Sequence, residues 1–438
     1  MKDEDKNGKR KLSAGTVCML IITTVVLAGT ALVLARLSSG AAVDLSKLKM
    51  NVLNLQEEPF RNLADNAEEK QKERPEPTQK PAEIPAAETE PVRGKETEFT
   101  LTIGGSISLS GEVRKNSRST DAKVADYNDV MMLLAPQIHS DENIVFFENI
   151  LSDRHKASDS TAPGQAAALL NEAGFNMAAC GFSQAYANGK DGIEETLSSL
   201  DRQGISAIGI RYADSVQEPE LRTVNGVQVS FLQYTANVPA KTRKTMAADG
   251  TDGMVPKTEI SLIRKDIDIA RDKGAEAVIV LVSWGKTDNN PDKSQRELAQ
   301  EIAAAGADLI VGCGSHVPQT AEYLHGKDGK SVLCIWSLGS LLCGDRSNIR
   351  RMSGYLLHVT VRSNEQGGVL ILNPEYTPVY TWKYKQDGRF YYRCIAADSE
   401  TPDGMDNEQS KSKAKAAETV AAVLKDTPLS KRGQANGP

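Results

Sequence analysis

The side chains in this sequence that could do chemistry stand directly after short apolar runs. Glu148 follows "NIVFF", and His316 follows "DLIVG" at the end of a glycine-rich turn. A carboxylate and an imidazole are common ligands of divalent metals, and together they can also work as a general acid and base. A catalytic metal site needs about three protein ligands or more, so this pair requires further partners for that role.

The residues that follow other strand-like runs are mostly weak metal ligands. Serine and glutamine are neutral donors, as at Ser183, Ser283 and Gln184, and phenylalanine, as at Phe182, has no donor atom. A thiolate could complete a Glu148/His316/Cys313 zinc site, but small cysteines at strand ends are more often packed in the core. The donors predict no metal or other cofactor, and Glu148, Ser183 and His316 are the candidates for any catalysis. The residues expected to line one binding cleft are Gly105, Ser106, Glu148, Asn149, Phe182, Ser183, Gln184, Ser283, Trp284, Cys313, Ser315, His316 and Gln319.

Ser183 raises a second hypothesis, because "GFSQA" resembles the G-x-S-x-G nucleophile elbow of hydrolases. An elbow needs a helix directly after the serine, whereas here "QAYANGKD" precedes the next helical sequence. His316 could act as the base only if the fold brought it within hydrogen-bond reach. A loop serine is the simpler interpretation. Trp284 and Trp336 could stack on sugar rings, but such aromatics are more often core residues.

The elements that would position these residues alternate between strands and helices from about 97 to 397. Strand-like runs such as "EFTLTIG" and "AEAVIVLVSWG" alternate with helical runs such as "SQRELAQEIAAAGA". Asn225-Gly226 predicts a hairpin, and the C-terminal part is rich in strands. Ligands of open α/β sheets bind beyond the carboxyl ends of the strands. We therefore expect the turns after the strands, including Gly104-Gly105-Ser106, to converge.

The composition excludes some classes of protein. The chain has 438 residues with 52 basic and 58 acidic side chains, a net charge of −6, and it lacks the basic footprint of a nucleic-acid binder. Its six cysteines form no C-x-x-C pair and do not read as a zinc ribbon or a disulfide framework. We expect no nucleic-acid partner.

The N-terminal region predicts a membrane anchor. Thr16–Ala35 is a run of 20 uncharged residues, about the length that spans a bilayer, and five basic residues precede it. We predict a cytoplasmic N-terminus (1–15), one transmembrane helix (16–36) and an extracytoplasmic remainder. A cleaved signal peptide, with "SSGAA" as its site, is the alternative. Residues 37–96, rich in Glu, Pro and Lys, predict a disordered tether, and 398–438 a disordered polar tail.

The order of the turns resembles the CapA family of poly-γ-glutamate capsule synthesis proteins. The matching segments include "LTIGGSISLSGEV", "IVFFENIL" and the run from "RELAQEIAAAGAD" through "GCGSHVPQ" to "WSLGSL", and they cover most of 97–345. The resemblance implies a metallophosphoesterase-like (calcineurin-like) fold. That fold is a layered α/β/β/α sandwich of two sheets flanked by helices.

The polar positions of that family are largely altered here. Family members read G-D, A-N-N-H and H-W-G where this chain has Gly104-Gly105, Gly181-Phe182-Ser183-Gln184 and Ser283-Trp284-Gly285. Their H-P-H-V-x-Q keeps only its second histidine, His316, and their N-L-E keeps Glu148. The resemblance therefore implies an ancestral metal site that is lost. Neutralising most of the ligands together leaves no crowd of buried, unpaired charges.

The resemblance also implies a part in the synthesis, export or retention of a capsule polymer such as poly-γ-glutamate. Because the metal ligands are mostly absent, we expect the protein to bind envelope polymer or capsule-synthesis membrane proteins and not to act as a metalloenzyme. A metal-dependent or serine-dependent hydrolase or transferase of envelope polymer is the alternative. A purely structural wall-associated domain is the third hypothesis.

Overall fold

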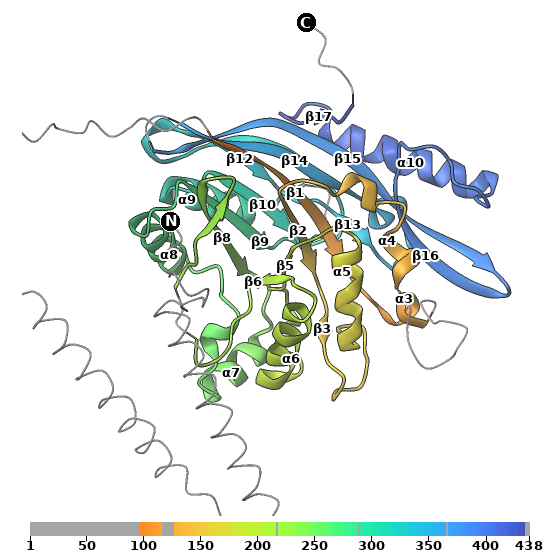
Figure 1. The fold of residues 1–438 in the computed structure, drawn as a ribbon, viewed down its shortest axis with the longest axis horizontal. Helices are drawn as coiled ribbons and strands as arrows, with labels where there is room; N and C mark the ends of the chain where they lie inside the picture. Colours follow the sequence, from red (N-terminus) through yellow and green to blue (C-terminus); the bar gives the residue numbers. More distant parts are fainter. Residues whose placement is uncertain (1–96, 116–126, 216–217, 288–289, 365–366, 434–438) are drawn as a thin grey trace, which may run out of the picture. The chain divides into compact units, whose positions relative to one another are not determined.

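Two β-sheets with helices on their outer faces make up the part of the chain that the computed structural model describes (Figure 1). The described residues are 97–433 except 116–126, 216–217, 288–289 and 365–366. They belong to one unit, residues 91–438. The predicted cytoplasmic N-terminus, anchor and tether lie outside the described residues. None of the helices described is long and apolar enough to cross a membrane.

The larger sheet has nine strands and contains both parallel and antiparallel pairs. Its order is β16-β15-β14-β1-β2-β5-β6, and β13 and β17 pair with β1 and β15. The pairs β1-β2, β2-β5 and β5-β6 are parallel, whereas β14, β15 and β16 extend the sheet antiparallel from β1. The strands are β1 (Glu98–Ile107), β2 (Glu142–Phe147), β5 (Met177–Ala179), β6 (Ser206–Ile208), β13 (Ser340–Leu342), β14 (Ser353–Ser363), β15 (Val369–Gln386), β16 (Arg389–Ala396) and β17 (Ser430–Lys431).

The second sheet has six strands in the order β11-β12-β10-β9-β8-β7. Its four central strands are parallel, and an antiparallel strand closes each edge. The strands are β7 (Arg222–Val224), β8 (Val227–Thr235), β9 (Ala277–Ser283), β10 (Leu309–Cys313), β11 (Ala321–His325) and β12 (Ser331–Ile335). A separate two-stranded sheet joins β3 (Ile150–Leu151) and β4 (Thr161–Ala162).

The helices are α3 (Gly111–Lys115), α4 (Asn128–Met131), α5 (Ala168–Glu172), α6 (Gly189–Asp201), α7 (Ala240–Ala248), α8 (Ile260–Asp272), α9 (Lys293–Ala305) and α10 (Asn407–Leu424). Helices α5 and α6 share a hydrophobic cluster with the outer face of the larger sheet, and α8 and α9 share one with the outer face of the smaller sheet. Helix α4 is only four residues long.

The layers follow from the side-chain pattern of the strands. Phe99, Leu101 and Ile103 alternate along β1 and contribute to the cluster between the sheets. In β9, Ile279 points to that same cluster, whereas its neighbour Val280 belongs to the cluster under α8 and α9. A parallel strand that is buried on both faces reads as a continuous apolar run, as "AVIVLV" does. The described residues thus stack as helix, sheet, sheet and helix, in the layered α/β order that was expected.

The prediction that Gly104-Gly105-Ser106 forms a turn after the first strand is wrong, because β1 continues to Ile107. The register of β1 against β2 shifts between Gly104 and Ser106, so the strand is irregular there. A Cβ atom at Gly105 would lie 2.3 Å from the carbonyl oxygen of Gly339. The glycine pair therefore allows another backbone to approach the strand.

The prediction of a disordered tail over 398–438 is also wrong for the described residues up to 433. Helix α10 begins with a capping box, in which Asp406 accepts from the backbone N–H of Gln409. Its buried Val420 and Leu424 join the cluster between the sheets, and Ala416 packs against aromatic residues of β15. The apolar residues at helical spacing were visible in sequence, but the surface that they cover was not. Strand β17 then pairs with β15.

The predicted hairpin at Asn225-Gly226 is confirmed. It joins β7 and β8, and both residues have positive φ angles, 47° and 89°, as the tight hairpin turn requires.

Candidate functional site

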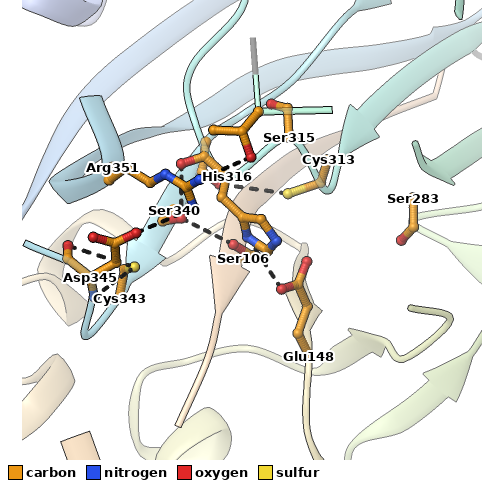
Figure 2. Close-up of polar contacts among 12 residues, drawn as sticks. Ser106, Glu148, Ser283, Cys313, Ser315, His316, Ser340, Cys343, Asp345 and Arg351 are labelled. Carbon is orange, nitrogen blue, oxygen red and sulfur yellow. Dashed lines mark hydrogen bonds and ion pairs between the residues drawn. The ribbon is translucent and has the colours of Figure 1, made fainter. Parts of the chain in front are cut away.

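The carboxyl ends of the parallel strands bring several predicted residues to one place, as expected. Glu148 directly follows β2, and His316 lies three residues after β10 ends at Cys313. Glu148 and His316 belong to different sheets, and their side chains meet: Nδ1 of His316 lies 3.4 Å from Oε2 of Glu148 (Figure 2). These two residues, singled out in the sequence as the strongest donors, thus face each other.

The backbone of His316 is strained, with a φ of 58°. The other non-glycine residues with positive φ among those described are asparagines and aspartates, and few residues other than glycine adopt this left-handed region. The turn is held by the buried hydroxyl of Ser315, whose Oγ lies 2.8 Å from the carbonyl oxygen of Val317 and 2.8 Å from Oγ of Ser337. These contacts keep the backbone at His316 in its uncommon conformation, a feature that recurs at functional sites.

Burial dominates the electrostatics of this pair. Desolvation raises the pKa of Glu148, and the nearby His316 lowers it by a smaller amount. The side chain of Glu148 is 12% exposed and that of His316 35% exposed, so solvent reaches the pair from the histidine side. A carboxyl group with a raised pKa beside an imidazole is a pairing that can exchange a proton with a ligand.

Cys313 lies behind the pair and is an unfavourable metal ligand. Burial raises the pKa of its thiol strongly, and the charge of Glu148 adds to the effect. Its Sγ lies 3.5 Å from the carbonyl oxygen of Gly339, to which it donates a hydrogen bond. A protonated, buried thiol packs as a small apolar side chain and does not offer the thiolate that zinc requires.

Ser283 lies apart from the Glu148–His316 pair and belongs to a separate polar cluster (Figure 2). Its hydroxyl donates to the carbonyl of Gly181 at 2.5 Å. The buried amide of Gln233, on β8, accepts from the N–H of Gly181 and donates to its carbonyl, both at 2.9 Å. Gln233 was not predicted, although a polar residue near the end of an apolar strand was a visible signal. This cluster consists of neutral hydrogen bonds and fills the space beside the turn that follows β5.

Ser183 does not form a nucleophile elbow. The segment after it is a series of turns, and α6 begins only at Gly189, as the sequence indicated. The imidazole that could have served as its base is paired with Glu148 instead. Phe182 is buried in the cluster under α5 and α6, whereas Gln184 is exposed. These three residues of the expected cleft therefore point into different surroundings.

Other residues of the expected cleft hold the turns together. Asn149 is fully buried and accepts from the N–H of Leu109 at 2.7 Å. Trp284 is also buried, and it stacks on Trp336 with ring centroids 5.7 Å apart, so neither ring is presented to a sugar. Gln319 is buried and accepts from Gln295. Ser106, also buried, hydrogen-bonds to Ser340 at 3.3 Å.

The sequence analysis missed a charged loop beside the histidine. It follows β13 and contains Cys343, Asp345 and Arg351 (Figure 2). Arg351 lies 3.4 Å from Asp345 and donates to Oγ1 of Thr287 at 3.0 Å. Hydrogen bonds from Ser347 lower the pKa of Asp345, and Arg351 and His316 contribute in the same direction. The run "CGDRSNIRR" carried this signal in its concentration of charge after a strand.

The donors present do not fit a bound divalent metal. Among the residues that the structure describes, no three His, Cys, Asp or Glu side chains converge on one point. Gly105 stands where the family pattern has an aspartate, and another backbone segment packs over it. A Cβ atom there would lie 2.3 Å from the carbonyl oxygen of Gly339. Restoring a carboxylate at Gly105 would thus require the backbone to move.

Three comparisons place the chain among known proteins. The PGA biosynthesis protein CapA of Bacillus subtilis is 27% identical over 229 residues, which are 52% of this chain and 57% of that protein. The chain therefore spans little more than half the length of that relative. The capsule biosynthesis protein CapA of Bacillus anthracis is 26% identical over 63% of this chain and 67% of its own length. A solved calcineurin-like phosphoesterase, YfkN of Bacillus subtilis, overlaps with a TM-score of 0.37 and 12% identity, covering 75% of this chain and 99% of that one. Overlap this low carries no conclusion about activity.

The match to a family model is the decisive comparison. The model described as bacterial capsule synthesis protein PGA_cap matches residues 100–345, more than half of the chain, and this range includes both Glu148 and His316. The two CapA relatives agree with that match. The chain therefore belongs to the PGA_cap family of bacterial capsule synthesis proteins, whose CapA members it resembles.

Proposed function

We propose that this protein is anchored in the membrane by residues 16–36, with its folded domain outside the cytoplasm, and that it acts in the assembly, export or retention of a capsule polymer. Its role is to bind the polymer, or membrane proteins that make it, without metal catalysis. Family membership and the names of the two CapA relatives support the link to capsule polymer. The apolar run with basic residues before it supports the anchor and the orientation.

The Glu148–His316 pair is the observation that carries the proposal. These are the two strong donors left at the family's ligand positions. They already pair with each other, since Nδ1 of His316 lies 3.4 Å from Oε2 of Glu148. A divalent ion held by this pair alone would lack the third protein ligand that catalytic sites use. The turns around the pair are closed by neutral hydrogen bonds, such as that of Ser283 to Gly181. The architecture of the site is kept, and the ligand set is not.

The charged loop indicates how an acidic polymer would be held. Arg351 and His316 are both partly exposed, with side-chain exposures of 24% and 35%. Their present partners, Asp345 and Glu148, are carboxylates. A polymer that carries carboxylates offers the same chemistry and can take the place of these partners. Poly-γ-glutamate, the polymer that the family description implies, has one carboxylate per residue.

The test is a binding titration of purified residues 91–438 with poly-γ-glutamate, with and without added zinc or manganese. We expect saturable binding that the metals do not strengthen, and a severalfold loss of affinity in Arg351→Gln. The matched control is Arg202→Gln, which removes one partly exposed arginine from the end of α6. Metal-dependent binding, or no effect of Arg351→Gln, would contradict the proposal.

One observation favours a second candidate function, a hydrolase or transferase of envelope polymer. The raised pKa of Glu148 beside His316 is the arrangement of an acid–base pair. If polymer cleavage is detected, Glu148→Gln and His316→Gln should each abolish it while the fold is retained. Ser183→Ala should leave it unchanged, because the described structure gives Ser183 no base.

A further inference from the structure

The long hairpin of β15 and β16 ends in a segment that contributes no residue to the Glu148–His316 site. Figure 1 shows the hairpin extending beyond the neighbouring helices and strands. Its two strands are joined directly by Asp387-Gly388, whose φ angles of 49° and 77° suit a tight two-residue turn. A turn of this kind gives the hairpin a fixed register, so its side chains have defined positions.

One face of the hairpin end combines lysines with an exposed aromatic ring. Cross-strand pairing places Lys385 opposite Phe390 and Lys383 opposite Tyr392, so the four side chains share a face. The ammonium groups of Lys383 and Lys385 lie 4.5 Å and 5.9 Å from the centroid of the Phe390 ring. Phe390 is 45% exposed, one of the few large apolar side chains exposed to that degree among the described residues.

The ion pairs among the described residues leave the cations of the hairpin end without a carboxylate partner. Within the described part of the chain, no carboxylate lies within ion-pair distance of Lys383, Lys385 or Arg389, whereas Arg393, closer to the body, pairs with Asp129 at 3.1 Å. The only carboxylate between Lys383 and Arg393 belongs to Asp387, in the turn. We call Lys383, Lys385 and Phe390, which share one face of the hairpin, the hairpin tip. It is a local positive charge on a chain whose net charge is −6.

The opposite face of the hairpin is held by the body of the domain. Trp382 donates from its indole nitrogen to Gln409 of α10 at 3.0 Å and stacks on Tyr384, with ring centroids 4.5 Å apart. Tyr384 in turn stacks on Tyr391 at 5.5 Å. The lysine and phenylalanine face is covered close to the body, where Tyr392 is buried in the cluster that contains Val130 and Met131 of α4. Lys385 and Phe390, nearer the turn, are exposed.

We propose that the hairpin tip docks on an anionic lipid surface, with Phe390 inserted among the headgroups and the lysines at the phosphates. Lysines whose ammonium groups lie over an exposed aromatic ring combine cations with an apolar side chain, which suits the boundary between water and lipid. A dissolved polyanion would engage the cations, but it gives no gain in free energy for an exposed phenyl ring. The predicted anchor at residues 16–36 would keep lipid at a high effective concentration.

The test is co-sedimentation of residues 91–438 with vesicles. The hydrophobic clusters of the described residues all lie within this unit, which can therefore be studied without the predicted anchor. We expect binding to phosphatidylcholine vesicles that contain phosphatidylglycerol, and little binding to phosphatidylcholine alone. Lys383→Gln/Lys385→Gln should weaken binding by about tenfold or more, since each cation near such a surface contributes about 1 kcal/mol. Phe390→Ser should weaken it severalfold at unchanged charge.

The matched control is Lys241→Gln/Lys244→Gln, which removes two exposed lysines from α7. It should bind vesicles like the parent. Lys385→Gln alone, at an exposed position, is the second tip variant if the first fails to fold. Equal loss in the control, or unchanged binding in both tip variants, would overturn the proposal. So would a tip that binds dissolved poly-γ-glutamate but not anionic vesicles. Neither result bears on the Glu148–His316 site, so this inference and the proposed function fail separately.

Discussion

The Glu148–His316 pair links the chemistry of the site to the stability of the fold. Glu148 is held in a mostly buried position where its charged form is disfavoured, and His316 is the partner that offsets part of this cost. His316 is itself held in the left-handed region, which few residues other than glycine adopt. A buried carboxylate and an uncommon backbone conformation both cost free energy. Such costs are concentrated at binding and catalytic sites.

Glu148→Gln should flatten the dependence of the free energy of unfolding on pH. Because burial raises the pKa of Glu148 above its ordinary 4.5, the folded protein keeps this proton at pH values where the unfolded chain has released it. The stability that this group contributes is therefore complete at low pH and is lost as the pH rises from 4.5 through the raised pKa. Urea denaturation at a series of pH values measures the effect.

His316→Gln is the complementary variant. It removes the charge that lowers the pKa of Glu148, so the loss of stability should extend to higher pH than in the parent. Identical pH profiles for the parent and both variants would show that the pair is not coupled.

Asn149→Ala should destabilise the domain by about 1–3 kcal/mol, because it leaves the N–H of Leu109 buried without an acceptor. Gln184→Ala, in the exposed turn after β5, is the control and should leave the free energy of unfolding within about 0.5 kcal/mol of the parent. Chemical denaturation compares the two. A loss for Asn149→Ala no larger than that of the control would mean that the loop does not depend on this bond.

At the scale of elements, strand ends and turns were predictable, and the packing between distant segments was not. The convergence of Glu148 and His316 followed from the rule that parallel strands end at one edge. The Asn225-Gly226 turn was fixed by local backbone preference. The irregularity of β1 at Gly105 depends on the backbone of Gly339, more than 200 residues away, and no local pattern reports such a contact.

Helix α10 is a second case in which long-range packing decided the outcome. Its polar, alanine-rich sequence resembles a solvated tail, and only Val420 and Leu424 mark the face that packs between the sheets. Composition alone cannot say whether a surface exists to receive such a face. The charged loop with Arg351 was missed for the same reason, since its neighbours Thr287 and His316 come from other turns.

Leu424→Ala should reduce the free energy of unfolding by about 2–5 kcal/mol, because the side chain is 2% exposed within the inter-sheet cluster. Asp406→Ala, which removes the cap of the same helix, should cost about 1 kcal/mol. Glu418→Ala, on the exposed face, is the control and should have no measurable effect. Thermal unfolding measures all three. A folded domain that tolerates Leu424→Ala without loss would show that the tail does not belong to the core.

At the scale of the whole molecule, we propose a polymer-binding domain that a long segment joins to a membrane anchor. Family membership connects the domain with capsule synthesis, and the sequence of residues 1–96 supplies the predicted anchor and tether. Deleting residues 1–36 should move the protein from the membrane fraction to the soluble fraction, without changing the melting temperature of the domain. Fractionation followed by immunoblotting measures this. A shortened chain that stays in the membrane fraction after a high-salt wash would contradict the predicted anchor.

The central claim is that this member of the PGA_cap family has kept the architecture of the site without a metal-binding set of ligands. The most direct test is the metal content of purified residues 91–438 from cells grown with added zinc and manganese, measured by plasma mass spectrometry. Glu148→Gln/His316→Gln is the matched control. We expect far less than one metal ion per chain in both proteins. A content near one ion per chain that is lost in the double variant would contradict it.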